Sequence, residues 1–274
     1  MEATRRAAVS IAFCGLAALL PASALAQAPA ASAEWKFSLT PYLWMPTVRS
    51  TVQYTLPASA GGGTATVEKH PGDYLKNLDL AVMLSGEARK GRWAIFTDFI
   101  FLDFSNQSSA VTTLGGPLGF VQVPVNSETT TGLKGGVWQL AASHNFSHSN
   151  TSTFEVLGGF RYMTLESTVN WQLAGPFGAF PQAGSATQKE ELWDAIVGVR
   201  GKAKLDANWF VPWYLDAGAG DSKLTYQGMA GIGYSFKWGD VLLAYRHLSY
   251  EQKDAKPIHE LQMSGFALGA TFHF

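Results

Sequence analysis

The last nine residues of the chain alternate between apolar side chains and small or polar ones. The apolar members occupy every second position, as Phe266, Leu268, Ala270, Phe272 and Phe274. Strict alternation is the period of a β-strand with two unlike faces. Such a strand needs a layer over its apolar face and a partner for its backbone. A transmembrane β-barrel supplies both, through lipid and through closure onto the first strand. We therefore expect residues 259–274 to form the closing strand of such a barrel.

Nine more segments upstream have the length and composition of strands, and all ten can be joined in chain order. The all-β fold that this predicts is an antiparallel, up-and-down transmembrane β-barrel of about ten strands, with eight or twelve as alternatives. The ten expected strands cover residues 35–44, 78–90, 92–104, 132–146, 153–169, 190–205, 208–219, 223–237, 240–251 and 259–274. Short turns alternate with connections that are mostly longer. With an even number of strands, the start of the first strand and the end of the last strand lie at the same rim of the barrel.

The composition fits strands rather than membrane-spanning helices. Apolar residues make up 47% of the chain, charged residues only 15%, and the mean hydropathy is +0.03. Beyond the first 26 residues no apolar run of about 20 residues occurs, which is the length a helix needs to cross a bilayer. A soluble periplasmic β-sandwich is the alternative interpretation of the same strand pattern.

The N-terminus has the three parts of a secretory signal. Arg5 and Arg6 precede an apolar run over residues 7–20, and Ala24-Leu25-Ala26 offers small residues at the positions that a signal peptidase reads. We expect cleavage after Ala26, so that residues 1–26 are the signal peptide and residues 27–274 the barrel domain.

The signal contains the only cysteine, and its removal changes the charge. Cys14 follows the bulky Phe13, which does not suit a lipoprotein signal, so the mature chain is expected to lack disulfides, thiol nucleophiles and Cys-ligated zinc. Of 20 basic and 21 acidic residues, the signal holds two arginines and one glutamate, which leaves 18 and 20 and a net charge of −2. This balance argues against a nucleic-acid partner.

Tryptophans are placed near the ends of the expected strands. Trp35, Trp93, Trp209 and Trp238 lie at the ends next to short turns, and Trp44 and Trp193 lie near the opposite ends. Indole rings favour the headgroup level of a membrane, so we expect two aromatic girdles.

The same alternation sorts the charged residues. An arginine or lysine side chain that faces lipid in the middle of the membrane costs roughly 2–4 kcal/mol. Charged residues within strands are therefore expected to point into the lumen and to form ion pairs there. Counting positions sends ten of them inward: Glu87, Arg89, Asp98, Glu155, Arg161, Asp194, Arg200, Lys202, Asp216 and Arg246. Five acids against five bases, with bulky Phe210, Tyr214 and Met229, predict a largely plugged lumen.

Several stretches resemble small proteobacterial outer-membrane barrel proteins, akin to OmpW and the transmembrane domain of OmpA. They are W-x-F-x-x-T-P-Y-L-W at 35–44, G-x-W…D at 91–98, W-D-x-x-V-G-x-R at 193–200 and A-G-I-G-Y-S-F…Y-R-H-L at 230–248. The resemblance implies a place in the cell outer membrane, contact with lipid and lipopolysaccharide, and no cofactor. It also implies that the assembly machinery reads the terminal strand with Phe272 and Phe274. It leaves the role and the oligomeric state open.

Two connections on the long-loop side are apolar and uncharged. Both contain a similar hexapeptide, at 114–119 and at 173–178. In one interpretation the loops form an apolar entrance that binds a hydrophobic solute. In the other, the two loops pack on each other and cover the barrel as a lid. The residues concerned are Leu114, Pro117, Phe120, Leu173, Pro176, Phe177 and Phe180.

One catalytic candidate is the set His247, Ser249 and Glu260. Its spacing resembles the His-x-Ser and downstream Glu of PagL-type lipid A 3-O-deacylases, in which a histidine would activate a serine for acyl transfer. Tyr250-Glu251 replaces the Asn-Ala of that family, and a girdle role for His247 is the other interpretation. The six histidines are scattered, so we expect neither an enzyme nor a metal site. The sequence favours a structural barrel, or a narrow passive channel or small-solute-binding barrel.

Overall fold

The computed structural model describes residues 34–54, 63–108, 114–115, 122–123, 130–149, 151–172, 183–253 and 258–274. The expected signal peptide and its cleavage site lie outside these residues. Two short helical segments, α1 (Pro71–Tyr74) and η1 (Leu75–Asn77), occur among them, and neither is long and apolar enough to span a membrane.

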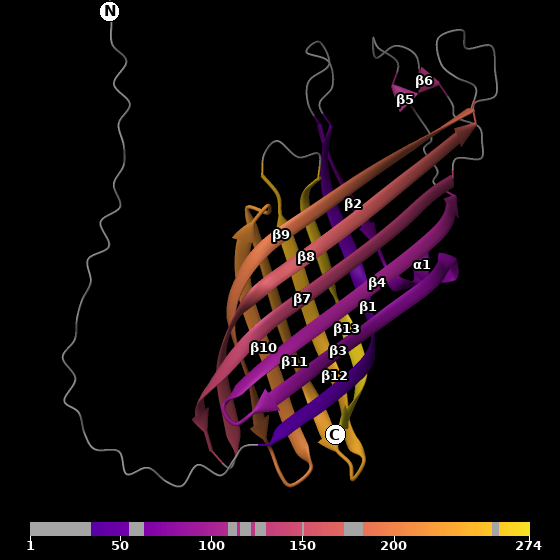
Figure 1. The fold of residues 1–274 in the computed structure, drawn as a ribbon. Coiled ribbons are helices and arrows are strands. Elements are labelled where there is room, and N and C mark those ends of the chain that lie inside the picture. The colour runs from indigo at the N-terminus through magenta and orange to yellow at the C-terminus, as the bar shows by residue number, and fades with distance from the viewer. Residues whose placement is uncertain are drawn as a thin grey trace, which may run out of the picture. The chain divides into compact units, whose positions relative to one another are not determined.

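Ten antiparallel strands close into a barrel, which confirms the predicted fold class (Figure 1). Each strand pairs with the next of the ten, and the last pairs with the first. In chain order they are β1 (Trp35–Tyr54), β3 (Leu78–Lys90), β4 (Trp93–Ser108), β7 (Thr130–His148), β8 (Ser152–Gln172), β9 (Ala183–Lys204), β10 (Trp209–Gly220), β11 (Leu224–Ser235), β12 (Gly239–Glu251) and β13 (Ile258–His273). Three short strands lie outside the ring: β2 (Gly63–Lys69), β5 (Leu114–Gly115) and β6 (Gln122–Val123).

One rim of the barrel carries tight turns, and we call it the short-turn end. Gly91 turns the chain between β3 and β4 with a φ of 59°, a left-handed conformation that favours glycine. Between β9 and β10 the carboxylate of Asp206 accepts the backbone N–H groups of Asn208 and Trp209, both at 2.7 Å. These two bonds hold the pKa of Asp206 below its ordinary value. The opposite rim, the long-loop end, carries connections that are mostly longer, although residues 221–223 join β10 and β11 there.

Closure of the barrel involves the terminal residue itself. The backbone N–H of Phe274 donates to the carbonyl of Phe37 at 2.9 Å, and the N–H of Phe37 donates back to Phe274 at 3.1 Å. The ladder between β13 and β1 then runs from Ser38–His273 to Val52–Ile258. The last residues of β13 thus contribute directly to the closure of the barrel.

Deletion of Phe274 is therefore expected to prevent assembly, because it removes two hydrogen bonds of the closing ladder and the terminal aromatic ring. Outer membranes from cells that express the deletion should lack the folded form that migrates faster on unheated gels. Phe274→Tyr, which keeps the backbone and the ring, is the control. Normal amounts of folded protein from the deletion would contradict this role.

The outward face of the barrel is apolar through its middle. Val197, Phe266 and Leu268 are 70%, 60% and 55% exposed, and Ile95, Leu215 and Leu243 are also exposed on their strands. Trp35, Trp93, Trp209 and Trp238 are exposed near the short-turn end, and Trp193 is exposed on β9. A band of apolar side chains with tryptophans near its edge is the surface expected of a barrel set in lipid.

Two predictions about the first strand were wrong. The strand was expected to end at Trp44, but β1 continues to Tyr54 because its second half pairs with β2, which the sequence analysis did not identify. Trp44 was expected in a girdle, but it is only 2% exposed and packs with buried apolar side chains. The extra length of β1 and the alternation of its side chains place Trp44 in the lumen rather than at a rim.

Candidate functional site

The lumen is the candidate site, because side chains from strands on opposite walls meet inside it. Arg246 on β12 contacts Asp98 on β4, and Arg200 on β9 contacts Glu87 on β3. The members of each pair lie on strands that are not neighbours in the sheet. These hydrogen bonds and ion pairs therefore cross the lumen and connect its walls.

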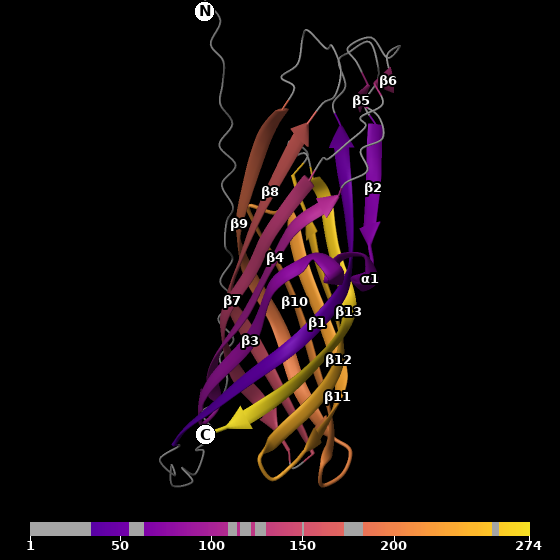
Figure 2. The same ribbon diagram turned by 90° about the vertical axis from the view of Figure 1, so that its right-hand side faces the viewer.

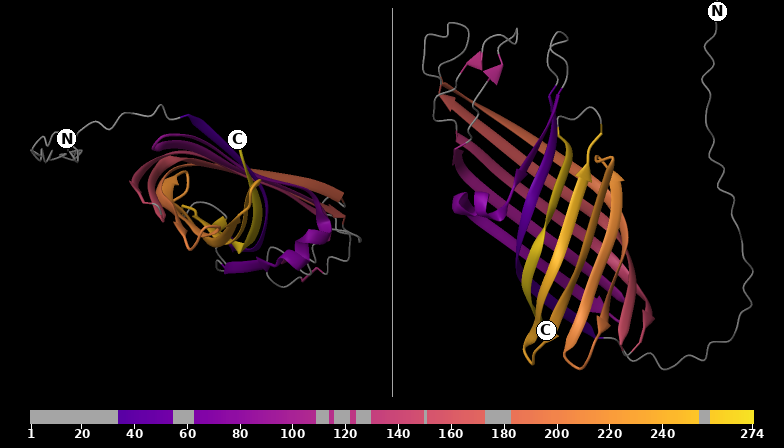
Figure 3. Two further views of the ribbon diagram at one scale, coloured as in Figure 1. Left: turned by 90° about the horizontal axis from the view of Figure 1, so that it is seen from below. Right: turned by 180° about the vertical axis from the view of Figure 1, so that it is seen from behind.

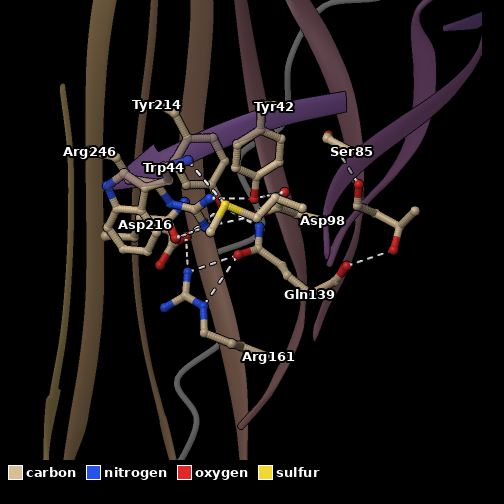
Figure 4. Close-up of polar contacts among 12 residues, drawn as sticks. Tyr42, Trp44, Ser85, Asp98, Gln139, Arg161, Tyr214, Asp216 and Arg246 are labelled. Carbon is tan, nitrogen blue, oxygen red and sulfur yellow. Dashed lines mark hydrogen bonds and ion pairs between the residues drawn. The ribbon is translucent and has the colours of Figure 1, made fainter. Parts of the chain in front are cut away.

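The middle of the lumen holds one buried ion pair with a network of neutral partners (Figure 4). Arg161 is fully buried and donates to the carboxylate of Asp216 and to Gln139 Oε1, the latter at 2.9 Å. Its other terminal nitrogen donates to Thr225 Oγ1 at 2.9 Å. The hydroxyl of Tyr214 donates to the same Asp216 oxygen and accepts a hydrogen bond from Gln139 at 2.7 Å. Neutral side chains thus form many of the hydrogen bonds that the guanidinium and the carboxylate do not make with each other.

A second pair at the same depth connects β12 with β4 and β1. Arg246 Nη2 lies 2.7 Å from Asp98 Oδ2 and 2.8 Å from Gln227 Oε1, and Nη1 donates to the Tyr42 hydroxyl at 3.0 Å. Tyr42 in turn donates to Asp98 Oδ1 at 2.8 Å, which closes a ring of hydrogen bonds. Figure 4 shows Tyr42, Asp98 and Arg246 beside the Arg161–Asp216 pair.

Nearer the short-turn end lies a cluster of two arginines and two glutamates. Arg200 contacts Glu87 and Glu155 at 2.8 Å each, and Arg89 contacts the same two carboxylates at 2.8 and 2.7 Å. Ser143 Oγ donates to Glu155 at 2.7 Å. The guanidinium of Arg200 also lies 4.2 Å from the ring centre of Phe96, where a cation is attracted by the ring face. Two charges of each sign balance one another at this level.

The short-turn rim carries a further set of contacts. Lys202 lies 3.6 Å from Asp240, and His273 Nε2 lies 3.2 Å from the same carboxylate. The ammonium group of Lys202 also lies 4.0 Å from the ring centre of Phe210. Phe210 covers Gly233 on β11, where a Cβ atom would come within 2.2 Å of its ring. Bulky and charged groups therefore narrow the lumen here as well.

Toward the long-loop end the lumen changes from polar to apolar. On several strands the polar residue of the middle layer is followed, two residues farther along, by a buried apolar one. The pairs are Tyr42 and Trp44, Asp98 and Ile100, Arg161 and Met163, and Arg246 and Leu248, together with Asp194 and Leu192 on β9, which runs the opposite way. Trp44, Met83, Ile100, Val137, Met163, Leu192, Leu248, Tyr250, Leu261 and Ala267 form one buried group, which we call the apolar cluster.

The structure brings most of the ten predicted lumen charges into contact with one another. Two of the ten, Asp194 and Lys202, pair outside the set. The two oxygens of Asp194 accept the N–H and the hydroxyl of Ser222, at 2.9 and 2.8 Å, from the connection between β10 and β11. Lys202 contacts Asp240, which the sequence analysis did not include. The neutral partners were not predicted either: Tyr42, Gln139, Ser143, Thr225 and Gln227. Their positions in the inward alternation were a usable signal, but their uncharged side chains gave no reason to single them out.

One buried hydroxyl of the apolar cluster has no partner. Tyr250 is fully buried, and its Oη makes no hydrogen bond with any residue that the structure describes. Burying an unpaired hydroxyl costs free energy, so the structural benefit of this oxygen is nil or negative. The Tyr214 hydroxyl is the opposite case, because both its donor and its acceptor capacity are used.

Removal of each hydroxyl should therefore have different effects. Tyr250→Phe is expected to leave the free energy of unfolding unchanged or to raise it, whereas Tyr214→Phe should lower it by about 1–3 kcal/mol. Urea unfolding of the two variants in detergent micelles, followed by tryptophan fluorescence, measures the difference. Equal losses in the two variants would show that the Tyr250 hydroxyl has a structural partner.

The catalytic candidates do not form a catalytic arrangement. His247 Nδ1 lies 2.6 Å from the Oγ of Ser264, and its ring packs against Tyr226. Glu260 accepts a hydrogen bond from Gln262 at 2.6 Å, and the hydroxyl of the fully buried Ser249 has no partner within the described part of the chain. Among the described residues, no hydrogen bond joins His247, Ser249 and Glu260 to one another.

The apolar entrance expected from the two outer loops lies almost wholly outside the described residues. Leu114 lies in β5, and Pro117, Phe120, Leu173, Pro176, Phe177 and Phe180 lie beyond the described ranges. Within those ranges, no group of three or more histidine, cysteine, aspartate or glutamate side chains is placed to hold a metal ion.

No family model and no curated protein matches the chain. Solved structures of bacterial membrane barrels do, with low similarity. The translocator domain of the autotransporter NalP from Neisseria meningitidis is 12% identical, with a TM-score of 0.41 and 90% of each chain covered. Neisserial surface protein A is 10% identical (TM-score 0.33; 87% of this chain and 97% of that one), and the Pseudomonas putida toluene transporter TodX is 7% identical (TM-score 0.33; 87% and 88%). The assignment of the fold rests on the strand register of this chain.

Proposed function

We propose that this chain is an integral outer-membrane barrel that binds small hydrophobic solutes in its lumen and does not act as a general pore. The observation that carries the proposal is the layering of the lumen. Balanced ion pairs cross its middle and its short-turn half, and the apolar cluster fills the part toward the long-loop end.

The outward surface supports a place in the membrane. Exposed phenylalanine, leucine and valine side chains cover the wall, and exposed tryptophans lie near the short-turn rim. In outer-membrane barrels the short turns face the periplasm and the long loops face outside. By that rule the apolar cluster faces the outer leaflet and the charged clusters face the periplasm.

The balanced charges argue against an open, selective pore. A selective channel carries an excess of one sign at its constriction. Here Arg89 and Arg200 meet Glu87 and Glu155, and each remaining guanidinium in the middle meets one aspartate. A barrel of ten strands is only slightly wider than one of eight, whose interior is filled by side chains.

The composition of the apolar cluster favours an adaptable binding site. Met83 and Met163 belong to it, and Met263 packs against it. Methionine side chains are unbranched and flexible, so they can reshape around a guest molecule. The unpartnered hydroxyl of Tyr250 offers one hydrogen bond to a guest that carries a single polar group.

Photolabelling tests this function. Protein in lipid nanodiscs is irradiated with a small alkyl diazirine, and the labelled residues are located by mass spectrometry. Labelling is expected at inward Met163 and Leu248, and an excess of unlabelled alkane should suppress it there. Outward Val197 and Leu243 serve as the lipid-facing reference. Labels confined to such outward residues would refute solute binding in the lumen.

A further inference from the structure

The wall of the barrel is interrupted between β1 and β3. The ladder between these strands runs from Trp35–Lys90 to Pro41–Leu84, and the ladder between β1 and β2 begins at Val48–Lys69. Among the described pairings, residues 42–47 of β1 belong to neither ladder, although they remain paired with β13. On β3, residue 78 and residues 80–83 pair with β4, and the described β1–β3 ladder does not extend to them. We call this interval the β1–β3 seam.

The seam lies in the half of the wall toward the long-loop end. Figure 2 and the right-hand view of Figure 3 show β1 continuing beside β13, while β3 leads back to α1. Thr47 Oγ1 lies 3.2 Å from His70 Nδ1, a contact that connects β1 to the residue before α1 at the far end of the seam.

A side chain takes the place of a ladder bond inside the seam. The backbone N–H of Trp44 donates to Met83 Sδ at 3.0 Å, where a continuous sheet would offer a backbone carbonyl. A thioether sulfur is a weak acceptor, so this contact holds the strands together less firmly than a ladder bond. Pro46, the next residue with the same orientation, has no N–H to satisfy. A proline at this position thus reduces the number of backbone N–H groups that lack a ladder acceptor in the seam.

The seam joins two apolar regions. On the outward side it is flanked by exposed Leu43, Met45, Leu80 and Val82. On the inward side are Trp44 and Met83, which are members of the apolar cluster, and Met83 is 8% exposed. A flexible methionine therefore separates the lipid-facing surface from the apolar interior of the lumen.

We propose that the β1–β3 seam is a lateral port through which an aliphatic chain passes from the outer leaflet into the apolar cluster, with Met83 as the side chain that closes it. The port admits a linear apolar chain because its outer flanks, its closing residue and its inner end are all apolar. The proposal rests on solute binding in the lumen and adds the route of entry to it.

Closing the seam by a reversible cross-link tests the route. The only cysteine, Cys14, precedes the barrel, so introduced pairs can be joined selectively. Leu43→Cys with Val82→Cys places one thiol on each flank, and a short bis-thiosulfonate reagent joins them. The matched control is Phe37→Cys with Ala88→Cys, an outward pair within the intact part of the same ladder. The probe is a fatty acid with a diazirine on its chain, supplied in nanodiscs.

The joined seam pair is expected to lose labelling at Met163 and Leu248, and reduction should restore it. The joined control pair should label as the wild type does, and Met83→Ala should label faster. If the joined seam pair labels its lumen at the wild-type rate, the chain enters by another route and the port is refuted, although solute binding stands. If the wild type itself shows no label in the lumen, solute binding fails first.

Discussion

Replacement of Arg161 by methionine is expected to lower the free energy of unfolding by about 3–5 kcal/mol, because it leaves a buried carboxylate without its cation. Arg161 and Asp216 are both fully buried at the side chain, and one Asp216 oxygen has no hydrogen-bond partner in the described ranges even with Arg161 present. Without the guanidinium, the Tyr214 hydroxyl is the remaining donor to this carboxylate. Urea unfolding in detergent micelles measures the loss.

Two further variants separate the lost ion pair from lost packing. Arg161→Met combined with Asp216→Asn removes both charges and should recover part of the loss, since no unpaired charge remains. Lys134→Met breaks the exposed ion pair with Asp103 and should cost less than about 1 kcal/mol. An Arg161→Met variant as stable as Lys134→Met would show that the buried pair adds little to the barrel.

Opening the lumen is expected to require changes in two layers. Arg200→Ala with Arg246→Ala removes cross-lumen contacts of the charged layers, but the apolar cluster still fills the lumen above them. Leu192→Ala with Leu248→Ala thins the apolar cluster and leaves the ion pairs in place. Because an apolar constriction excludes ions and a filled charged layer blocks them, each pair alone should leak little.

All four substitutions together should give a steady conductance, on the order of tenfold or more above that of either pair, because two barriers in series must both be removed. Planar-bilayer recording measures it, and gel mobility without heating verifies that each variant is folded. Lys189→Ala, an exposed residue on the outward face, is the control and should stay silent. Full conductance from the arginine pair alone would show that the apolar cluster is no barrier.

The sequence was sufficient for nine of the ten barrel strands and for the inward direction of their charged side chains. Alternation alone placed Arg161, Arg200 and Arg246 inward, and nine of the ten expected strands differ only at their ends from those observed. Alternation carries no information on which residues meet across a lumen, since that depends on the stagger of strands that are not neighbours. Arg161 meets Asp216 rather than Asp194, its direct cross-strand neighbour, which binds Ser222 instead.

The first strand shows what a local pattern cannot predict. The first strand was expected to end at Trp44, where the local pattern of residues showed no further strand signal. In the structure the strand continues, because β13 supports one side throughout and β2 takes over the other side from Val48. The seam and the inward position of Trp44 follow from this exchange of partners, which involves segments far apart in the chain.

The central claim is that side chains from opposite walls close the lumen. Planar-bilayer recording of the purified wild-type protein tests it most directly. The ion pairs of Arg161, Arg200 and Arg246, together with the apolar cluster, predict a silent membrane, with at most brief, small openings. Large, steady, porin-like conductance steps from the wild type would contradict it.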